Sequence, residues 1–403
     1  MRGSRISSRL VVAATLLSSA LLLFCCFTTG DANGRLELGY YSSSCPRAED
    51  IVREQVTQLY HKHGNTAVSW LRALFHDCMV GSCDASLLLD GGVSEKSSPR
   101  SFGMRNFKYV DAIKSALERE CPGTVSCADV LALAARDGAA ILAGGGPLAA
   151  EMPMRTGRLD SRVAASHADV ERAIPDHNAT VSEMLAAFAA AGVSGGAEAV
   201  TALLGAHSVG RVHCANLVAR LYPAVDAGVD PAYGEYLRGR CPTADAREDT
   251  RDVAYARNDR VTPMVLDNMY YKNLLARRGL LLVDQRLADD PRTKPFVERM
   301  AADNDYFHDR FAAALVALSE NNPLGAGEGE VRRDCSEHEG KVRSRIFGRG
   351  RLRCWDEHAT GGTVCCWYWT MTTWVVMVVE DQEIACLGQS QSIVSMDSFH
   401  AAT

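Results

Sequence analysis

The most informative stretch of this 403-residue sequence is Ser69-Trp-Leu-Arg-Ala-Leu-Phe-His-Asp-Cys78. Its apolar residues recur at helical spacing, which predicts a helix. Arg72 and His76 are four residues apart and therefore lie on one face of that helix. Because both side chains can be cationic, they make a poor structural ion pair. They suit a site where a proton is removed and the resulting anion is stabilised.

Helical spacing continues on both sides of this stretch. The predicted helices are Ala48–Tyr60, Ala67–Phe75, Val110–Leu117, Ala128–Leu142, Val181–Ala191, Ala197–Leu204 and Phe311–Leu318. Thr180 and Glu183 have the spacing of a capping box, which predicts where one of these helices begins. Strand-like alternation is almost absent between Gly34 and Ser336, so the predicted fold class is mostly α.

A second histidine, His207, ends the apolar segment Leu203-Leu-Gly-Ala-His-Ser-Val-Gly210. Taken alone, a histidine in such a position is more often a satisfied core or surface residue than a ligand. The spacing by itself therefore leaves a structural and a functional interpretation of His76 and His207 open.

The composition limits the class of protein. A hydrophobic fraction of 47% and a charged fraction of 23% are typical of a soluble globular chain. They exclude a disordered, collagen-like or wholly membrane-embedded protein. The length is ordinary for two domains. The formal net charge of −6 argues against nucleic acid as a main partner, because polyanion binders usually carry the opposite charge.

The N-terminus and the cysteines indicate an oxidising compartment. Arginines followed by an apolar run over residues 10–27 predict a secretory signal peptide over residues 1–33, with an uncleaved signal anchor as the alternative. Two of the 14 cysteines would leave with that peptide. Eight lie between Cys45 and Cys335 and four in the last 50 residues, and spacing alone does not select their pairing. Zinc is disfavoured because no CxxC pair is present.

Several segments together resemble one family, the secreted plant haem peroxidases (class III). Leu71-Arg-Ala-Leu-Phe-His-Asp-Cys-Met-Val-Gly-Ser-Cys-Asp-Ala-Ser86 resembles its distal signature, and Ala202-Leu-Leu-Gly-Ala-His-Ser-Val-Gly210 its proximal one. The likeness continues through Tyr40–Pro46, Cys121–Asp129, Gly157–Asp160, Asp267–Tyr271 and Asp284-Gln285. It implies a two-domain fold over residues 34–339 with haem b between two helical domains. The distal domain would be residues 34–160 plus the C-terminal helix, and the proximal domain residues 161–305.

The resemblance implies an enzyme that reduces hydrogen peroxide by heterolytic cleavage and then oxidises small phenolic donors in one-electron steps. His207 would be the axial ligand of the haem iron, and Asp284 would accept its other ring N–H. His76 would move the proton between the peroxide oxygens, and Arg72 would stabilise the charge that develops. Phe75 would pack at the haem face.

The resemblance also implies two calcium ions and four disulfides. The distal calcium ligands would be Asp77, Val80, Ser82, Asp84, Ser86 and Glu95. The proximal ligands would be Ser208, Asp259, Thr262, Val265 and Asp267. The disulfides would be Cys45–Cys121, Cys78–Cys83, Cys127–Cys335 and Cys214–Cys241. Asn178 lies in the glycosylation sequon Asn178-Ala-Thr180, and the protein is expected to be a monomer.

Three departures from the family limit this transfer. The family usually has Asn one residue after a Pro, where it accepts a hydrogen bond from the distal His; here Arg100 follows Pro99. A guanidinium can only donate, and a nearby cation lowers the pKa of a histidine, so we expect slower peroxide reduction unless Arg100 points away. The stretch before Gly157 is longer than usual in the family, so the sequence does not identify the residue that lines the donor channel; Pro153 and Arg155 are the candidates. The chain also continues past the last family cysteine, as residues 340–403.

This C-terminal extension has no counterpart in the resemblance. It contains a basic stretch and then an apolar run, Val364–Val379, that is shorter than the roughly 20 residues of a membrane-spanning helix. A vacuolar sorting signal, an interfacial membrane anchor and unstructured sequence outside the fold are the three interpretations. Overall, the sequence predicts a secreted cell-wall peroxidase; a catalytically impaired haem protein and a membrane-tethered peroxidase are the alternatives.

Overall fold

The structure is a computed structural model. It describes residues 36–91, 94–144, 148, 152–244 and 254–337, together with four strands between residues 351 and 389. The chain divides into two compact units, residues 1–338 and 339–403, which are described separately. The predicted signal peptide lies outside the described residues. None of the described helices is long and apolar enough to cross a membrane.

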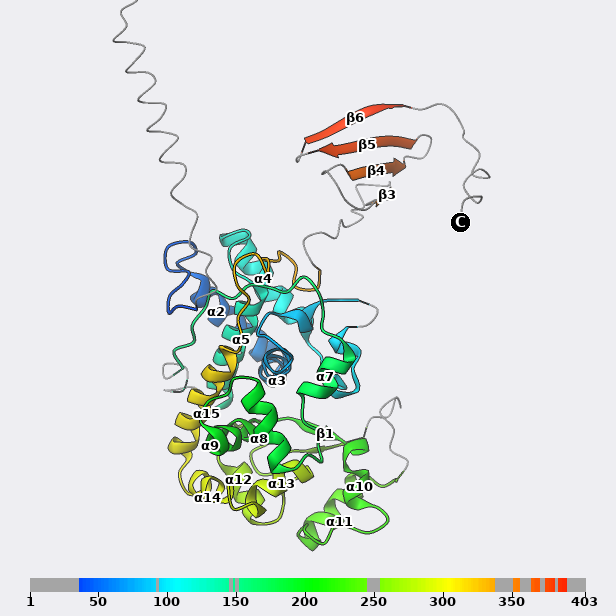
Figure 1. The fold of residues 1–403 in the computed structure, drawn as a ribbon. Coiled ribbons are helices and arrows are strands. Elements are labelled where there is room, and N and C mark those ends of the chain that lie inside the picture. The colour runs from blue at the N-terminus through cyan, green and yellow to red at the C-terminus, as the bar shows by residue number, and fades with distance from the viewer. Residues whose placement is uncertain are drawn as a thin grey trace, which may run out of the picture. The chain divides into compact units, whose positions relative to one another are not determined.

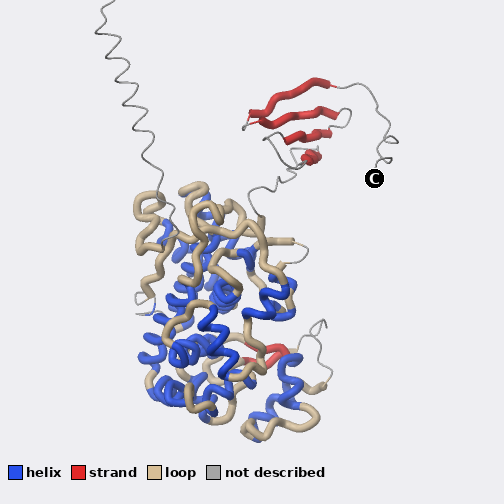
Figure 2. Tube along the Cα trace, in the orientation of Figure 1, coloured by secondary structure: helices blue, strands red, loops and turns tan. Residues whose placement is uncertain are grey.

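The first unit is mostly helical, as predicted (Figures 1 and 2). Its α-helices are α2 (Ala48–Lys62), α3 (Thr66–Met79), α4 (Phe107–Glu120), α5 (Cys127–Leu142), α7 (His167–Ala173), α8 (Val181–Ala190), α9 (Gly196–Leu204), α10 (Val218–Leu221), α11 (Pro231–Arg240), α12 (Met269–Leu275), α13 (Leu282–Asp289), α14 (Lys294–Ala302) and α15 (Asn304–Ser319). Short 3₁₀ turns are η1 (Ser86–Leu88), η2 (Glu95–Ser97), η3 (Pro99–Ser101), η4 (Gly205–Ser208) and η5 (Cys214–Leu217). Strands β1 (Arg211–His213) and β2 (Tyr255–Arg257) pair antiparallel.

Helix α5 is the central element of the end of the unit that also holds α2 and α4 (Figure 1). It begins at Ser126, whose hydroxyl accepts the Asp129 backbone N–H at 3.1 Å, and almost all of its side chains are buried. Helix α3 packs closely on it at Gly138, where an added Cβ would lie 3.3 Å from the Cα of Ala67. The small residues of α5 therefore fix the position of α3, which carries Arg72 and His76.

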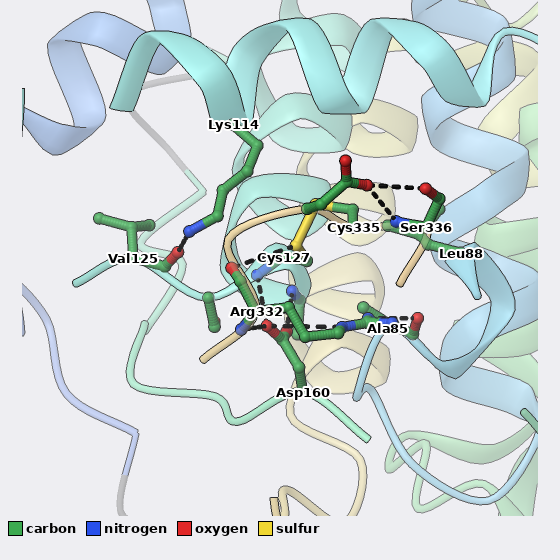
Figure 3. Close-up of a disulfide and its surroundings, with 12 residues drawn as sticks. Ala85, Leu88, Lys114, Val125, Cys127, Asp160, Arg332, Cys335 and Ser336 are labelled. Carbon is green, nitrogen blue, oxygen red and sulfur yellow. Dashed lines mark hydrogen bonds and ion pairs between the residues drawn. A yellow bond between two sulfur atoms is a disulfide. The ribbon is translucent and has the colours of Figure 1, made fainter. Parts of the chain in front are cut away.

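Four disulfides join the described residues, and they are the four pairs that the resemblance implies. They are Cys45–Cys121, Cys78–Cys83, Cys127–Cys335 and Cys214–Cys241. The Cys127–Cys335 bridge ties the end of the unit to the start of α5 across 208 residues (Figure 3).

A buried carboxylate organises the surroundings of that bridge (Figure 3). Asp160 accepts hydrogen bonds from the backbone N–H groups of Cys127, Ala128 and Arg332 at 3.0, 2.8 and 2.9 Å. Arg332 in turn donates to the carbonyl of Ala85 at 2.7 Å, in the loop that follows α3. The C-terminal segment is thus bonded to both the α5 N-terminus and the loop after the distal helix.

The second unit is described only as backbone. Strands β3 (Arg351–Trp355), β4 (Val364–Trp369), β5 (Trp374–Glu380) and β6 (Glu383–Gln389) form an antiparallel sheet in that order (Figure 1). These strands were not predicted from the sequence. A continuous apolar run such as Val364–Val379 lacks the alternation by which a half-buried strand is recognised.

Candidate active site

Helix α3 places His76 and Arg72 on the same face, one turn apart. His76 is buried. Burial first, and then the charge of Arg72, hold the pKa of His76 well below its usual value. The imidazole is therefore neutral at physiological pH, which is the form that a general base needs. Phe75 contacts the imidazole edge to face, with 5.8 Å between ring centroids.

Two backbone carbonyls hold the guanidinium of Arg72. Its Nη1 donates to the carbonyl of Phe102 and its Nη2 to the carbonyl of Arg100, both at 3.1 Å. Burial and the charge of Arg105 lower its pKa to about 10, so it remains a cation at neutral pH. The cation is thus held one helical turn from His76 by the loop that contains η3.

The side chain of Arg100 points away from His76. Its Nε lies 3.0 Å from Oε2 of Glu171, and its Nη1 bonds to Asp176. The cation that lowers the pKa of His76 is Arg72, which favours the alternative in which Arg100 points away. Two carboxylates neutralise Arg100 instead. His76 Nδ1 is nevertheless buried without a hydrogen-bond partner among the described residues, as expected where the family's Asn is missing.

The proximal histidine is positioned by close packing around η4. An added Cβ at Gly205 would lie 2.4 Å from Phe307 Cε2 and 2.5 Å from the Tyr271 hydroxyl, so only glycine fits there. His207, two residues on, donates from Nδ1 to Oδ1 of Asp284 at 2.8 Å. Burial pushes the pKa of His207 down, but Asp284 outweighs it by charge and hydrogen bonding, and the net shift is upward.

This arrangement fits an iron ligand. The Asp284 carboxylate is buried, whereas 40% of the His207 side chain is exposed. With Nδ1 held by the carboxylate, Nε2 is the nitrogen available to a metal, and the carboxylate increases its basicity. The described residues therefore fit a haem whose iron binds Nε2 of His207.

Sequence reasoning missed Tyr270. Its hydroxyl donates to the same Asp284 Oδ1 at 2.9 Å, so that oxygen accepts two hydrogen bonds. Tyr270 lies in the Asp267–Tyr271 segment that carries part of the family resemblance, but nothing in the segment itself indicates which tyrosine faces Asp284. A cavity of about 10 Å³ adjoins the hydrogen-bonded pair His207 and Asp284, and its lining also includes Asn258 and Tyr270.

Sequence reasoning also missed His213, on β1. Its ring packs on Phe102 at 4.5 Å between centroids, and an added Cβ at Gly103 would lie 2.8 Å from its Nε2. Burial, and then Arg72 and two further arginines, lower its pKa. A second neutral imidazole thus lies next to Phe102, whose carbonyl accepts a hydrogen bond from Arg72, and it belongs to a strand that the sequence pattern did not predict.

The predicted distal calcium ligands include three buried acids. Burial, then Asp84 and then Glu95, raise the pKa of Asp77 well above normal. Burial raises the pKa of Glu95 to about 7. Glu95 Oε1 accepts the Ala165 backbone N–H at 3.1 Å, while its Oε2 is buried without a partner. Such uncompensated negative charge fits a hard cation.

The other predicted distal calcium ligands converge less closely on one point. The Ser82 hydroxyl donates to the carbonyl of Asn322 at 2.8 Å, and the Ser86 backbone N–H donates to Asp84 Oδ1 at 3.0 Å. Val80, whose carbonyl is the predicted ligand, ends α3. No group of three or more His, Cys, Asp or Glu converges closely enough to hold a metal within the described ranges.

Four of the predicted proximal calcium ligands, Asp259, Thr262, Val265 and Asp267, lie in the loop between β2 and α12, and the fifth, Ser208, lies in η4. Asp259 Oδ2 accepts from the Thr262 hydroxyl at 2.8 Å, and the Val265 backbone N–H donates to the Thr262 carbonyl at 3.0 Å. Burial raises the pKa of Asp267. The Ser208 hydroxyl, next to His207, is buried without a partner among the described residues.

The two donor-channel candidates, Pro153 and Arg155, lie in the segment that precedes Gly157. Arg155 pairs with Glu320, at the end of α15, with 2.7 Å between Nη1 and Oε1. Pro153 precedes it in an irregular segment. Neither has a contact with Arg72 or His76 among those of the described residues.

Comparison with known proteins agrees with this geometry. The profile of the peroxidase family matches residues 52–303, which include both histidine neighbourhoods. Peroxidase 21 of Arabidopsis thaliana is 58% identical over 318 residues, covering 78% of this chain and 94% of that protein. Peroxidase 42 of the same plant is 52% identical, covering 76% and 91%. Peroxidase 4 of Vitis vinifera is 35% identical, covering 76% and 93%.

The fold and the matched span define a haem-dependent oxidoreductase. The chain belongs to the peroxidase family, as a class III plant haem peroxidase, and it reduces hydrogen peroxide with small molecules as electron donors.

Proposed function

We propose that this enzyme cleaves hydrogen peroxide heterolytically with haem b held by His207, and that His76 and Arg72 do the acid–base and electrostatic work. The observation that carries the proposal is the 2.8 Å hydrogen bond from His207 Nδ1 to the buried Asp284, which leaves Nε2 to the iron. Haem b, when bound, supplies the redox-active iron at which the O–O bond is broken.

The protein's own residues move the proton and stabilise the charge. His76, neutral because burial and Arg72 lower its pKa, accepts a proton from one peroxide oxygen. It returns that proton to the other oxygen, which departs as water. Among the described residues, the carbonyls of Phe102 and Arg100 use two of the five guanidinium N–H groups of Arg72, so others can donate to the oxygens as negative charge develops. Phenolic donors then return two electrons, one at a time.

Calcium is the second part of the proposal. The distal ion would be held around Asp77, Asp84 and Glu95, at the end of α3, and the proximal ion around Asp259 and Asp267, near His207. The buried acids with raised pKa values and the unpartnered oxygens of Glu95 and Ser208 support this. Each ion would hold one of the two histidine segments in place.

Secretion is the third part. The four disulfides require an oxidising compartment, and the N-terminal run has the pattern of a signal peptide. We place the enzyme in the cell wall as a monomer, or in the vacuole if the extension is a sorting signal. Asn178 is exposed and thus accessible to glycosylation. An impaired haem binder is less favoured, because Arg72, His76 and His207 are all present.

The residue roles are tested by comparing His207→Ala with His76→Ala. His207→Ala should lose haem or its native iron spectrum, whereas His76→Ala should keep the Soret band. Peroxide reduction by His76→Ala should fall by at least about 10²-fold, the usual contribution of a general base. Near-normal peroxide reduction by His76→Ala would show that another group moves the proton.

A further inference from the structure

The loop that holds Arg72 is fixed on its other side by charged residues. This loop, residues 94–102, contains η2 and η3 and faces α7 and the segment after it. The Ser97 hydroxyl lies 2.7 Å from His167 Nε2, and the Ser98 hydroxyl donates to Glu171 Oε1 at 3.3 Å. The loop therefore bridges α7 and the guanidinium of Arg72.

Arg100 forms the contacts on both sides of this loop, one through its backbone carbonyl and the other through its guanidinium. Its carbonyl accepts from Arg72 Nη2 at 3.1 Å. Its guanidinium is paired with Glu171 and Asp176. Asp176 is itself fixed, because its other oxygen accepts the Asn178 backbone N–H at 2.8 Å. The ion pairs of Arg100 with Glu171 and Asp176 thus determine where the Arg100 carbonyl lies against Arg72.

We propose that Arg100 is a positioning residue for peroxide reduction: its guanidinium, held by Glu171 and Asp176, keeps its own carbonyl against Arg72. This inference rests on the role of Arg72 proposed above. The side chains of Arg100, Glu171 and Asp176 are 23%, 41% and 39% exposed, so the pairs add little to stability. Their effect is on geometry, since a three-residue 3₁₀ turn has few hydrogen bonds of its own to resist a shift.

The consequence is specific to an arginine at this position. A residue that cannot reach both carboxylates leaves the turn free to move, and Arg72 then loses one of its two carbonyl partners. A misplacement of about 1 Å in such a group can cost up to about 10²-fold in rate. The loop of this enzyme thus orients Arg72 through a backbone carbonyl, while His76 Nδ1 has no described partner.

The test compares Arg100→Gln and Arg100→Lys with Arg155→Gln in the haem-loaded enzyme. Arg155→Gln removes a similar surface ion pair, with Glu320, that does not touch Arg72. Three quantities are measured: the dissociation constant of fluoride from the ferric enzyme, the second-order rate constant with peroxide, and the thermal midpoint. Fluoride binds the iron as an anion and accepts hydrogen bonds from distal donors, so it reports the placement of Arg72 without any turnover.

We expect Arg100→Gln to weaken fluoride binding and slow peroxide reduction by about tenfold each. Arg100→Lys, which can reach one carboxylate, should be intermediate. Arg155→Gln should leave both quantities unchanged, although its thermal midpoint should fall as much as that of Arg100→Gln. Asp176→Asn in the Arg100→Gln background should add no further loss, because the two side chains act through one contact.

Equal fluoride affinity in the wild type and both Arg100 variants would overturn the proposal, as would an equal loss in Arg155→Gln. A wild-type enzyme that binds haem but does not reduce peroxide would instead refute the proposed roles of Arg72 and His76. The two failures are therefore distinguishable.

Discussion

Glu95 should contribute a loss of stability to the calcium-free enzyme as the pH rises from about 4.5 to about 7. Burial raises the pKa of Glu95 from 4.5 to about 7 in the folded protein. In this pH window the folded state holds a proton that the unfolded chain has released, so folding is favoured by acid. The contribution of Glu95 is present below about pH 4.5 and is lost as the pH approaches 7.

The size of the effect follows from the shift. A difference of about 2.5 pKa units, at 1.36 kcal/mol for each unit, corresponds to about 3 kcal/mol. Bound calcium would favour the carboxylate and abolish this loss at neutral pH. We therefore expect Glu95→Gln to be more stable than the wild type by about 3 kcal/mol at neutral pH without calcium, and to lose that advantage near pH 4.5.

The assay is urea unfolding of chelator-treated enzyme, with disulfides intact, followed by far-ultraviolet circular dichroism across this pH range. Glu298→Gln, on the exposed side of α14, is the matched control and should leave the pH profile unchanged. Calcium should flatten the difference between the wild type and Glu95→Gln. Parallel pH profiles for those two proteins in the absence of calcium would refute the reasoning, because the carboxyl would then titrate alike in the folded and unfolded states.

Two further predictions concern packing and the domain boundary. Gly205→Ala should destabilise the enzyme by about 1–3 kcal/mol and shift the iron spectrum, since the new methyl group would lie 2.4 Å from Phe307, beside the turn that carries His207. Urea unfolding measures the stability and absorption spectroscopy the iron spectrum, and an unchanged spectrum would contradict the prediction. A chain that ends near residue 340 should keep haem, the Cys127–Cys335 bridge and full activity; a truncated protein that fails to fold would show that the extension belongs to the domain.

Sequence patterns located the long amphipathic helices and missed most of the short elements. The predicted bounds were too narrow in two of the long helices, because Phe311–Leu318 covers only the second half of α15 and Val110–Leu117 only the middle of α4. Ala128–Leu142 was predicted almost residue for residue, because a long apolar run marks it. Helix α7 and the helices α10–α14 were not predicted. Seven-residue helices such as α7 and α12 present too few turns for a helical period to stand out, and their positions depend on packing against distant segments.

Among the candidate site residues, those close together in the sequence were likewise easier to predict than those far apart. His76 and Arg72 could be paired from spacing alone, because both lie on one helix. His207 and Asp284 are 77 residues apart, so only the family resemblance joined them before the structure did. Tyr270 lies in a segment of the family resemblance, but neither the spacing nor the resemblance identified it or His213 as part of the site, since a hydrogen bond from a phenol to a distant carboxylate leaves no periodic pattern.

Arg100 shows why a single departure from a family pattern is hard to interpret from sequence. Judged alone, a guanidinium beside a catalytic histidine should lower the pKa of that histidine. The structure instead pairs it with Asp176, 76 residues away, and with Glu171 on α7. Because Glu171 and Asp176 compensate its charge, an arginine in place of the family's asparagine has almost no electrostatic effect on His76. Its physical effect is instead to position the Arg100 carbonyl that accepts a hydrogen bond from Arg72. The meaningful unit of comparison with other peroxidases is therefore the set Arg100, Glu171 and Asp176: an arginine at this position without the two carboxylates should slow peroxide reduction, whereas the three together should preserve the orientation of Arg72.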